Sequence, residues 1–107
     1  MTGTFRIKET SWVAGIAALV LRGNTAAIVL GNRIHLYGIS KKDFLADVKF
    51  LRHELKHVEQ YQQLGRGRFL FLYLLETLRH GYYKNKFEVE ARKAESDTAI
   101  TNRFSLQ

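Results

Sequence analysis

The sequence predicts an α+β fold in a single domain that spans residues 1–107. Three observations predict it. The length suits one hydrophobic core, two short strand-like runs flank a Gly-Asn pair, and apolar residues recur at helical spacing elsewhere. With 46% apolar and 25% charged residues, the composition is typical of folded globular proteins. We expect a compact domain with an N-terminal helix, a short β-hairpin and further helices.

The N-terminal part is expected to hold the first helix and the hairpin. A polar cap precedes a helix that begins at Trp12 and stops at Gly23. The runs 26–30 and 33–37 have the length and composition of strands, and Gly31-Asn32 between them suits a tight turn. The first helix is apolar and too short to cross a bilayer, so we expect it in the core.

The rest of the chain is expected to hold three helices. Ser40 is a suitable cap for a helix over about residues 41–64. An apolar helix over 69–78, ended by Gly81, is predicted to be core, and a polar helix follows over about 84–98. Neither apolar run is long enough for a membrane span, so we expect a soluble, cytoplasmic protein.

Charge and cysteine content limit the classes of site and partner. The chain has no cysteine, which excludes disulfides and thiolate metal sites and leaves histidines and acids as ligands. The net charge of +7 could attract an acidic partner, nucleic acid or anionic lipid, or it could simply be a solvated basic surface. The oligomeric state stays open.

The run His53-Glu54-Leu55-Lys56-His57 carries the strongest chemical signal. Residues four apart on a helix lie on one face, about 6 Å apart along the axis, so both imidazoles can bind one tetrahedral zinc ion. Glu54 then lies where a carboxylate can take a proton from a water whose pKa the zinc ion lowers. On a helical wheel the two histidines fall outside both the apolar arc and the solvated arc. We therefore predict that they bind zinc.

A catalytic zinc site needs a third protein ligand and an open position. Four residues are candidates from the sequence alone: Glu88, Glu90, His80 and His35.

His53-Glu54-x-x-His57, with Phe87-Glu88-Val89-Glu90-Ala91 downstream, resembles the gluzincin branch of the zincin metallopeptidases. The chain is similar in size to the minigluzincins. The resemblance covers residues 26–95 and implies a zincin-like domain with a motif helix and a C-terminal glutamate helix. It makes Glu88 the third zinc ligand in preference to Glu90. At Arg92 the related families have an aspartate that hydrogen-bonds a ligand histidine, so another residue must do so here.

The resemblance also implies how a substrate would be held. In zincins an edge strand before the motif helix pairs with the extended peptide, and the run 33–37 occupies that place. Gluzincins use a tyrosine or histidine to steady the oxyanion, and among His80, Tyr82 and Tyr83 we choose Tyr83.

The leading hypothesis is zinc-dependent hydrolysis of peptide bonds in a peptide or protein substrate, with Glu54 as the general base. A second hypothesis is a zinc ion that only holds helices together, which a fourth protein ligand would favour. A third is a basic binding module for nucleic acid or an acidic partner. A latent enzyme, with the tail 99–107 lying in the cleft, is a further alternative.

Overall fold

A four-stranded mixed sheet forms the framework of the computed structural model, which describes residues 3–20 and 23–107. The strands are β1 (Gly3–Lys8), β2 (Ala26–Leu30), β3 (Arg33–Tyr37) and β4 (Phe104–Leu106), in the order β2-β3-β1-β4. β2 and β3 form the predicted antiparallel hairpin, whose turn holds Gly31 at a φ of 67°. β1 runs parallel to both β3 and β4.

The strand order corrects the expectation that residues 33–37 form the edge strand. β3 pairs with β2 on one side and with β1 on the other, so it lies inside the sheet. The edge strands are β2 and β4, and within the hairpin β2 makes more contact with the motif helix. No local sequence pattern predicts this position, because β1 pairs with β3 through a parallel, non-local contact.

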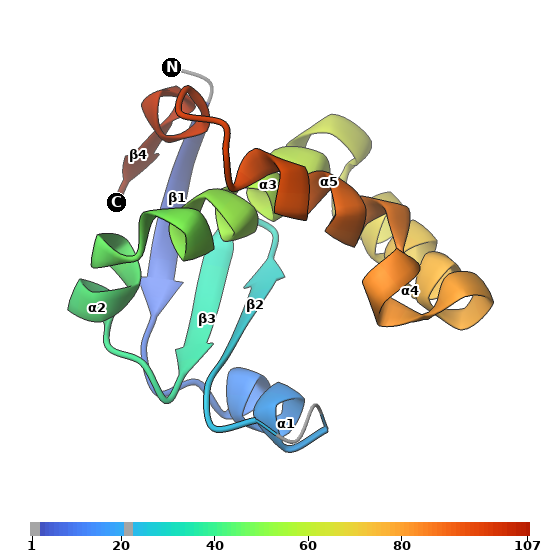
Figure 1. Cartoon of the computed structure of the whole chain (residues 1–107), viewed down its shortest axis with the longest axis horizontal. Coiled ribbons are helices and arrows are strands. Elements are labelled where there is room, and N and C mark those ends of the chain that lie inside the picture. Colours follow the sequence, from blue (N-terminus) through green and yellow to red (C-terminus); the bar gives the residue numbers. More distant parts are fainter. Residues whose placement is uncertain (1–2, 21–22) are drawn as a thin grey trace.

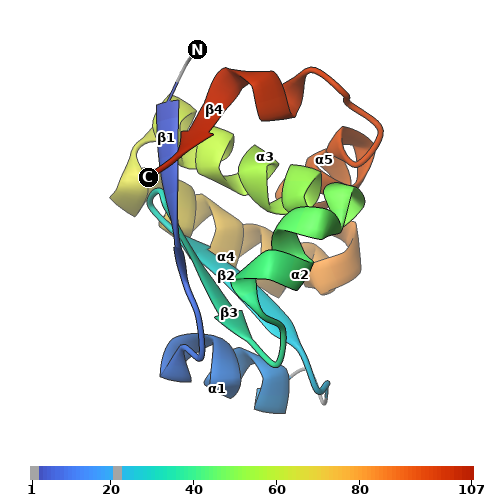
Figure 2. The ribbon, with the colours of Figure 1, turned by 90° about the vertical axis from the view of Figure 1, so that its left-hand side faces the viewer.

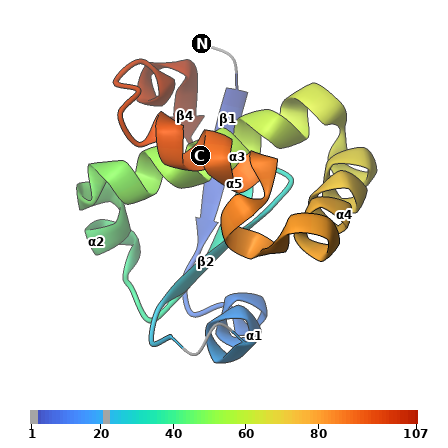
Figure 3. The ribbon, with the colours of Figure 1, turned by 45° about the vertical axis from the view of Figure 1, so that its right-hand side comes forward.

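Five α-helices accompany the sheet in the described part of the chain (Figure 1). They are α1 (Trp12–Val20), α2 (Lys41–Ala46), α3 (Val48–Leu64), α4 (Arg66–Lys84) and α5 (Lys86–Ala94), and a 3-10 helix, η1, covers Ile100–Arg103. Figure 2 shows α1 at the end of the molecule away from both termini, and Figure 3 shows α5 lying along α3 with α4 beside it. The α+β class and the hairpin are thereby confirmed. None of the described helices is long and apolar enough to cross a membrane.

The helix predicted over 41–64 is two helices, α2 and α3, which meet at Asp47. The backbone of Asp47 leaves helical geometry (φ −88°, ψ 89°), and the Asp47 side chain accepts a hydrogen bond from the Phe50 N–H. Asp47 therefore caps the motif helix, as the predicted cap Ser40 does for α2 through the Asp43 N–H. The Asp47 cap begins α3 about one and a half turns before His53.

The main core lies between the sheet and α3. Ile34 and Leu36 of β3 pack with Leu55 and Val58 of α3, and the motif helix is thus held by its apolar stripe. Residues of the C-terminal segment join the same cluster, because Ile100 of η1 and Phe104 of β4 are buried. The hypothesis that the tail 99–107 lies in a cleft is therefore wrong: the tail completes the sheet.

The apolar helices α1 and α4 are far more exposed than predicted. In α1 only the small residues Ala14 and Ala18 are buried among its described side chains, while Trp12 is 75% exposed. In α4 only Phe69 is buried, and Leu78 is 85% exposed. Apolar composition predicts burial on average, but here the sheet and α3 leave one side of each helix uncovered.

Candidate metal centre

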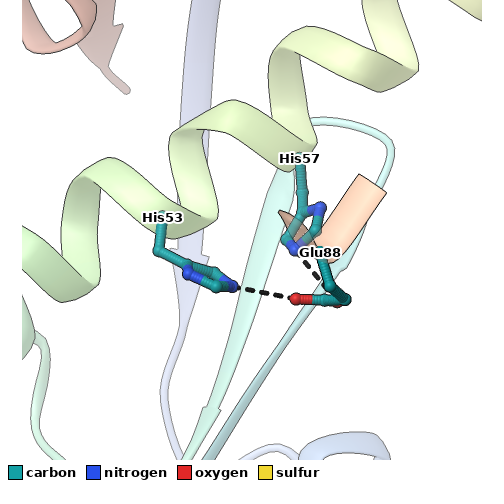
Figure 4. Close-up of side chains that lie close together, drawn as sticks. All are labelled: His53, His57 and Glu88. Carbon is teal, nitrogen blue, oxygen red and sulfur yellow. Dashed lines mark hydrogen bonds and ion pairs between the residues drawn. The ribbon is translucent and has the colours of Figure 1, made fainter. Parts of the chain in front are cut away.

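The motif helix α3 presents both histidines on one side (Figure 4). The ring centroids of His53 and His57 are 5.2 Å apart, as expected for positions separated by one helical turn. His57 is buried and His53 is partly buried. The two rings therefore face a common volume with little access to bulk water.

Glu88 of α5 completes this cluster. Its Oε1 lies 3.0 Å from His53 Nε2 and its Oε2 lies 3.2 Å from His57 Nε2. The start of α5 is fixed by Asn85, which is buried, accepts a hydrogen bond from the Phe87 N–H and donates to the Tyr73 carbonyl. The cap therefore sets the position of Glu88 relative to α3.

The other nitrogen of each histidine is held by a separate residue. His53 Nδ1 lies 2.8 Å from Glu95 Oε2, and His57 Nδ1 lies 2.9 Å from Gln60 Oε1. When each Nδ1 donates its proton to these oxygens, each Nε2 carries a lone pair that points into the cluster and can bind a metal ion. In the related families an aspartate at the position of Arg92 makes a hydrogen bond to a histidine. Here Glu95 makes the corresponding hydrogen bond, to His53.

Sequence reasoning missed Glu95 and Gln60, although a signal was present. Glu95, the C-cap of α5, follows Glu88 by about two turns, and Gln60 follows His57 by three residues, so each lies on the face of its cluster residue. Glu90 is oriented differently, because its Oε1 accepts a hydrogen bond from Gln60 Nε2 at 2.9 Å. Of the two glutamates, Glu88 therefore joins the histidines.

The residues present fit a zinc ion. One donor atom each from His53, His57 and Glu88 lies within 4.8 Å of the other two. Ligands about 2.0–2.1 Å from a tetrahedral zinc ion lie roughly 3.4 Å apart, close to the 3.0 and 3.2 Å separations between the histidine nitrogens and Glu88. Two imidazoles and one carboxylate are also a ligand set of catalytic rather than structural zinc sites.

Glu54 lies beside this cluster and is buried, with 6% of its surface exposed. Its Oε2 is 4.0 Å from His53 Nε2, so it reaches the same volume without displacing a ligand. Burial raises the pKa of Glu54 to about 7, against the opposing effect of the two histidines. A carboxyl group with this pKa can both accept and release a proton near neutrality.

The charges within the cluster stabilise one another. Burial by itself would lower the pKa of His53, but the Glu88 hydrogen bond and the Glu54 charge outweigh it and raise that pKa to about 9. The pKa of His57 is raised by the same two acids against the same burial. Burial would raise the pKa of Glu88, yet its hydrogen bonds with both histidines hold it far below the usual range. With a pKa of about 9, His53 in the metal-free protein is protonated near neutral pH and donates from Nε2 to Glu88.

Two tyrosines approach the cluster, and neither is the predicted Tyr83. Tyr73 donates from its hydroxyl to Glu88 Oε2 at 2.5 Å. Tyr82 is 47% exposed but lines the adjoining cavity. Partial burial of its hydroxyl, together with the Glu88 and Glu54 carboxylates, raises the pKa of Tyr82, so the hydroxyl stays protonated. Tyr83 is 71% exposed, lies outside the cavity lining, and stacks under the Arg92 guanidinium, 4.0 Å from the ring centroid.

The remaining ligand candidates lie elsewhere. His80 is exposed and 3.9 Å from Glu76 on the same helix. His35 lies on β3, where its Nδ1 is 2.9 Å from Ser11 Oγ, and burial with the nearby Arg33 and Lys8 lowers its pKa. Neither residue belongs to the cluster that the described part of the chain forms.

A cavity of about 500 Å³ opens beside the cluster, between α1, β2 and α4. Glu54, His57 and Glu88 form part of its wall, and the rest is mostly apolar. The lining includes residues from all three neighbouring elements: Trp12, Ile16, Ala27, Val29, Leu70 and Leu74. The cluster is therefore accessible from a groove that the edge strand β2 borders.

Comparison of the chain with protein-family models, with curated proteins and with solved structures found no match. The donor set, the buried Glu54 and the adjoining groove therefore carry the functional assignment.

Proposed function

We propose that the chain is a zinc-dependent metallopeptidase of the gluzincin type, in which His53, His57 and Glu88 bind the metal. One observation carries the proposal: both histidine Nε2 atoms converge on the two oxygens of Glu88 while Glu54 and an open groove adjoin them. A structural zinc site would be closed by a fourth protein ligand. Among the described residues the group contains three, which favours a site that leaves one position for water or substrate.

The chain's own residues supply the remaining parts of peptide-bond hydrolysis. A bound zinc ion would act as a Lewis acid, polarising the carbonyl and lowering the pKa of a water toward roughly 7. Glu54 takes a proton from the attacking water while the water oxygen bonds to the carbonyl carbon. Glu54 then gives the proton to the leaving nitrogen as the C–N bond breaks, so the proton count balances.

Two further groups would hold the substrate. The Tyr82 hydroxyl, protonated and at the cavity wall, is suited to donate a hydrogen bond to the developing oxyanion. The outer edge of β2 can pair with an extended peptide backbone, which would lie along the groove. In this arrangement the scissile bond passes the cluster at the groove wall.

The test separates metal binding from hydrolysis. We expect Glu54→Gln to retain about one zinc per chain and to lose peptide hydrolysis by at least about a hundredfold, since general-base catalysis contributes 10²–10⁴-fold. Glu88→Gln should lose zinc, whereas the matched control Glu90→Gln should keep it because Glu90 faces Gln60. Zinc content is measured by mass spectrometry of the dialysed protein, and hydrolysis with a fluorogenic peptide library. Hydrolysis by the Glu54→Gln variant at the native rate would refute the mechanism.

A further inference from the structure

The sides of α1 and α4 that border the groove continue beyond it as two exposed apolar stripes. Trp12 and Ile16 line the groove, and Leu19 follows them on the same face of α1. On α4, Leu74 lines the groove and shares its face with Phe71 and Leu78. We call these residues the apolar face: Trp12, Ile16, Leu19, Leu70, Phe71, Leu74 and Leu78.

A surface of this kind is covered when the protein does its work, because folded proteins rarely expose so many large apolar side chains together. A peptide confined to the groove would leave most of the face uncovered, since Leu19, Phe71 and Leu78 are exposed and do not line it. Whatever covers the face must therefore span both helices and the groove between them.

Outside the groove, whose wall includes Glu54 and Glu88, the charge beside the apolar face is mainly positive. Helix α4 has Arg66, Arg68, Arg79 and Lys84 against the single acid Glu76. Residues 10–42, which include α1 and the hairpin, contain no acidic residue at all. Most acids of the chain lie instead on α3, α5 and the C-terminal segment. This distribution repels a second copy of the chain and attracts an anionic surface.

We propose that the apolar face docks onto the surface of a bilayer that contains anionic lipid. Exposed Trp, Phe and Leu beside Arg and Lys is the composition of helices that lie in the membrane interface without crossing it. In this arrangement the side chains of the apolar face enter the lipid, the basic residues of α4 contact the headgroups, and the groove opens toward the membrane. The docking does not depend on metal binding or on hydrolysis.

The only tryptophan of the chain, Trp12, reports directly on this docking. The protein is titrated with vesicles of phosphatidylcholine alone and with vesicles of phosphatidylcholine and phosphatidylglycerol in equal amounts. Trp emission and co-sedimentation are recorded for both. With anionic vesicles we expect a blue shift and binding at least about tenfold tighter than with neutral vesicles, lost again in high salt. Glu54→Gln should bind vesicles as the native protein does, which separates this inference from the proposed catalysis.

Paired substitutions locate the contact. Phe71→Ser with Leu78→Ser should weaken vesicle binding by at least about tenfold, because each buried apolar side chain contributes strongly. Val48→Ser is the matched control, since Val48 is also exposed but lies at the start of α3. Native-like binding by the double variant, equal binding to neutral vesicles, or no binding to anionic vesicles would each overturn the proposal. Dimers in light scattering without vesicle binding would assign the face to a second copy instead.

Discussion

Removal of the Glu95 carboxylate should weaken zinc binding although Glu95 is not a ligand. Its Oε2 lies 2.8 Å from His53 Nδ1, and this contact holds the ring in place and would leave Nε2 free for the proposed metal. Loss of such a partner costs 10–100-fold in metal affinity in other proteins. The Glu95 side chain is 34% exposed, so water replaces part of the interaction. We therefore expect Glu95→Ala to weaken affinity by about 10- to 30-fold, or ~1.4–2 kcal/mol.

The assay is competition for zinc against a chromophoric chelator, with three matched proteins. Glu95→Gln keeps an oxygen acceptor for Nδ1 and should lose less affinity than Glu95→Ala. Asp43→Ala removes a carboxylate from the exposed surface of α2, far from the cluster, and should bind zinc as the native chain does. Nitrogen chemical shifts of the His53 ring add a readout that general destabilisation does not move. A zinc affinity of Glu95→Ala within twofold of that of the native chain would refute the role of Glu95.

Two further perturbations test the cluster and the fold. In the metal-free protein the pKa of His53 is raised from 6.5 to about 9, so its stabilising contribution is complete below pH 6.5 and is lost as the pH rises through 9. Thermal unfolding in EDTA should show this loss in the native chain and a smaller loss in His53→Gln, in which His57 with its raised pKa remains. Zinc should reverse the trend because the ligands must be deprotonated. A loss of equal size in the two proteins would contradict the role of His53. Phe104→Ala should destabilise the fold by about 3–5 kcal/mol in urea unfolding, because the buried ring links β4 to the core. A loss below about 1 kcal/mol would mean that the C-terminal segment is not part of the cooperative unit.

The parts of the fold that were predicted correctly are those with local causes. The hairpin follows from Gly31-Asn32 between two strand-like runs, and α3 follows from its apolar stripe. β1 and β4 were missed because each is stabilised by parallel pairing with a partner far along the chain. The break at Asp47 was missed although aspartate is a common cap, because the apolar spacing continues on both sides of it.

In the candidate site, too, the residues that local sequence brings together were predicted, and those that depend on tertiary packing were harder to predict. His53, Glu54 and His57 are recognisable because a helix alone brings them together. Glu88 depends on the packing of α5 against α3, which the sequence indicates only through a resemblance. The choice between Tyr82 and Tyr83 depends on the direction of the chain at Gly81, whose φ of 81° turns it between the two segments of α4. The glycine predicts the break in the helix, but neither spacing nor composition predicts the direction that the chain takes after it.

The outer edge of β2 also bears on the behaviour of the protein at high concentration. Its sequence, Ala26–Leu30, has no charged residue, and the whole chain has no proline, so the edge lacks the usual features that prevent strand addition by another copy. The net charge of +7 opposes contact between copies, and the range of this repulsion shrinks to about 10 Å in 0.1 M salt. Salt should therefore promote aggregation through this edge. A peptide bound to this edge would cover it and would therefore reduce aggregation of the protein.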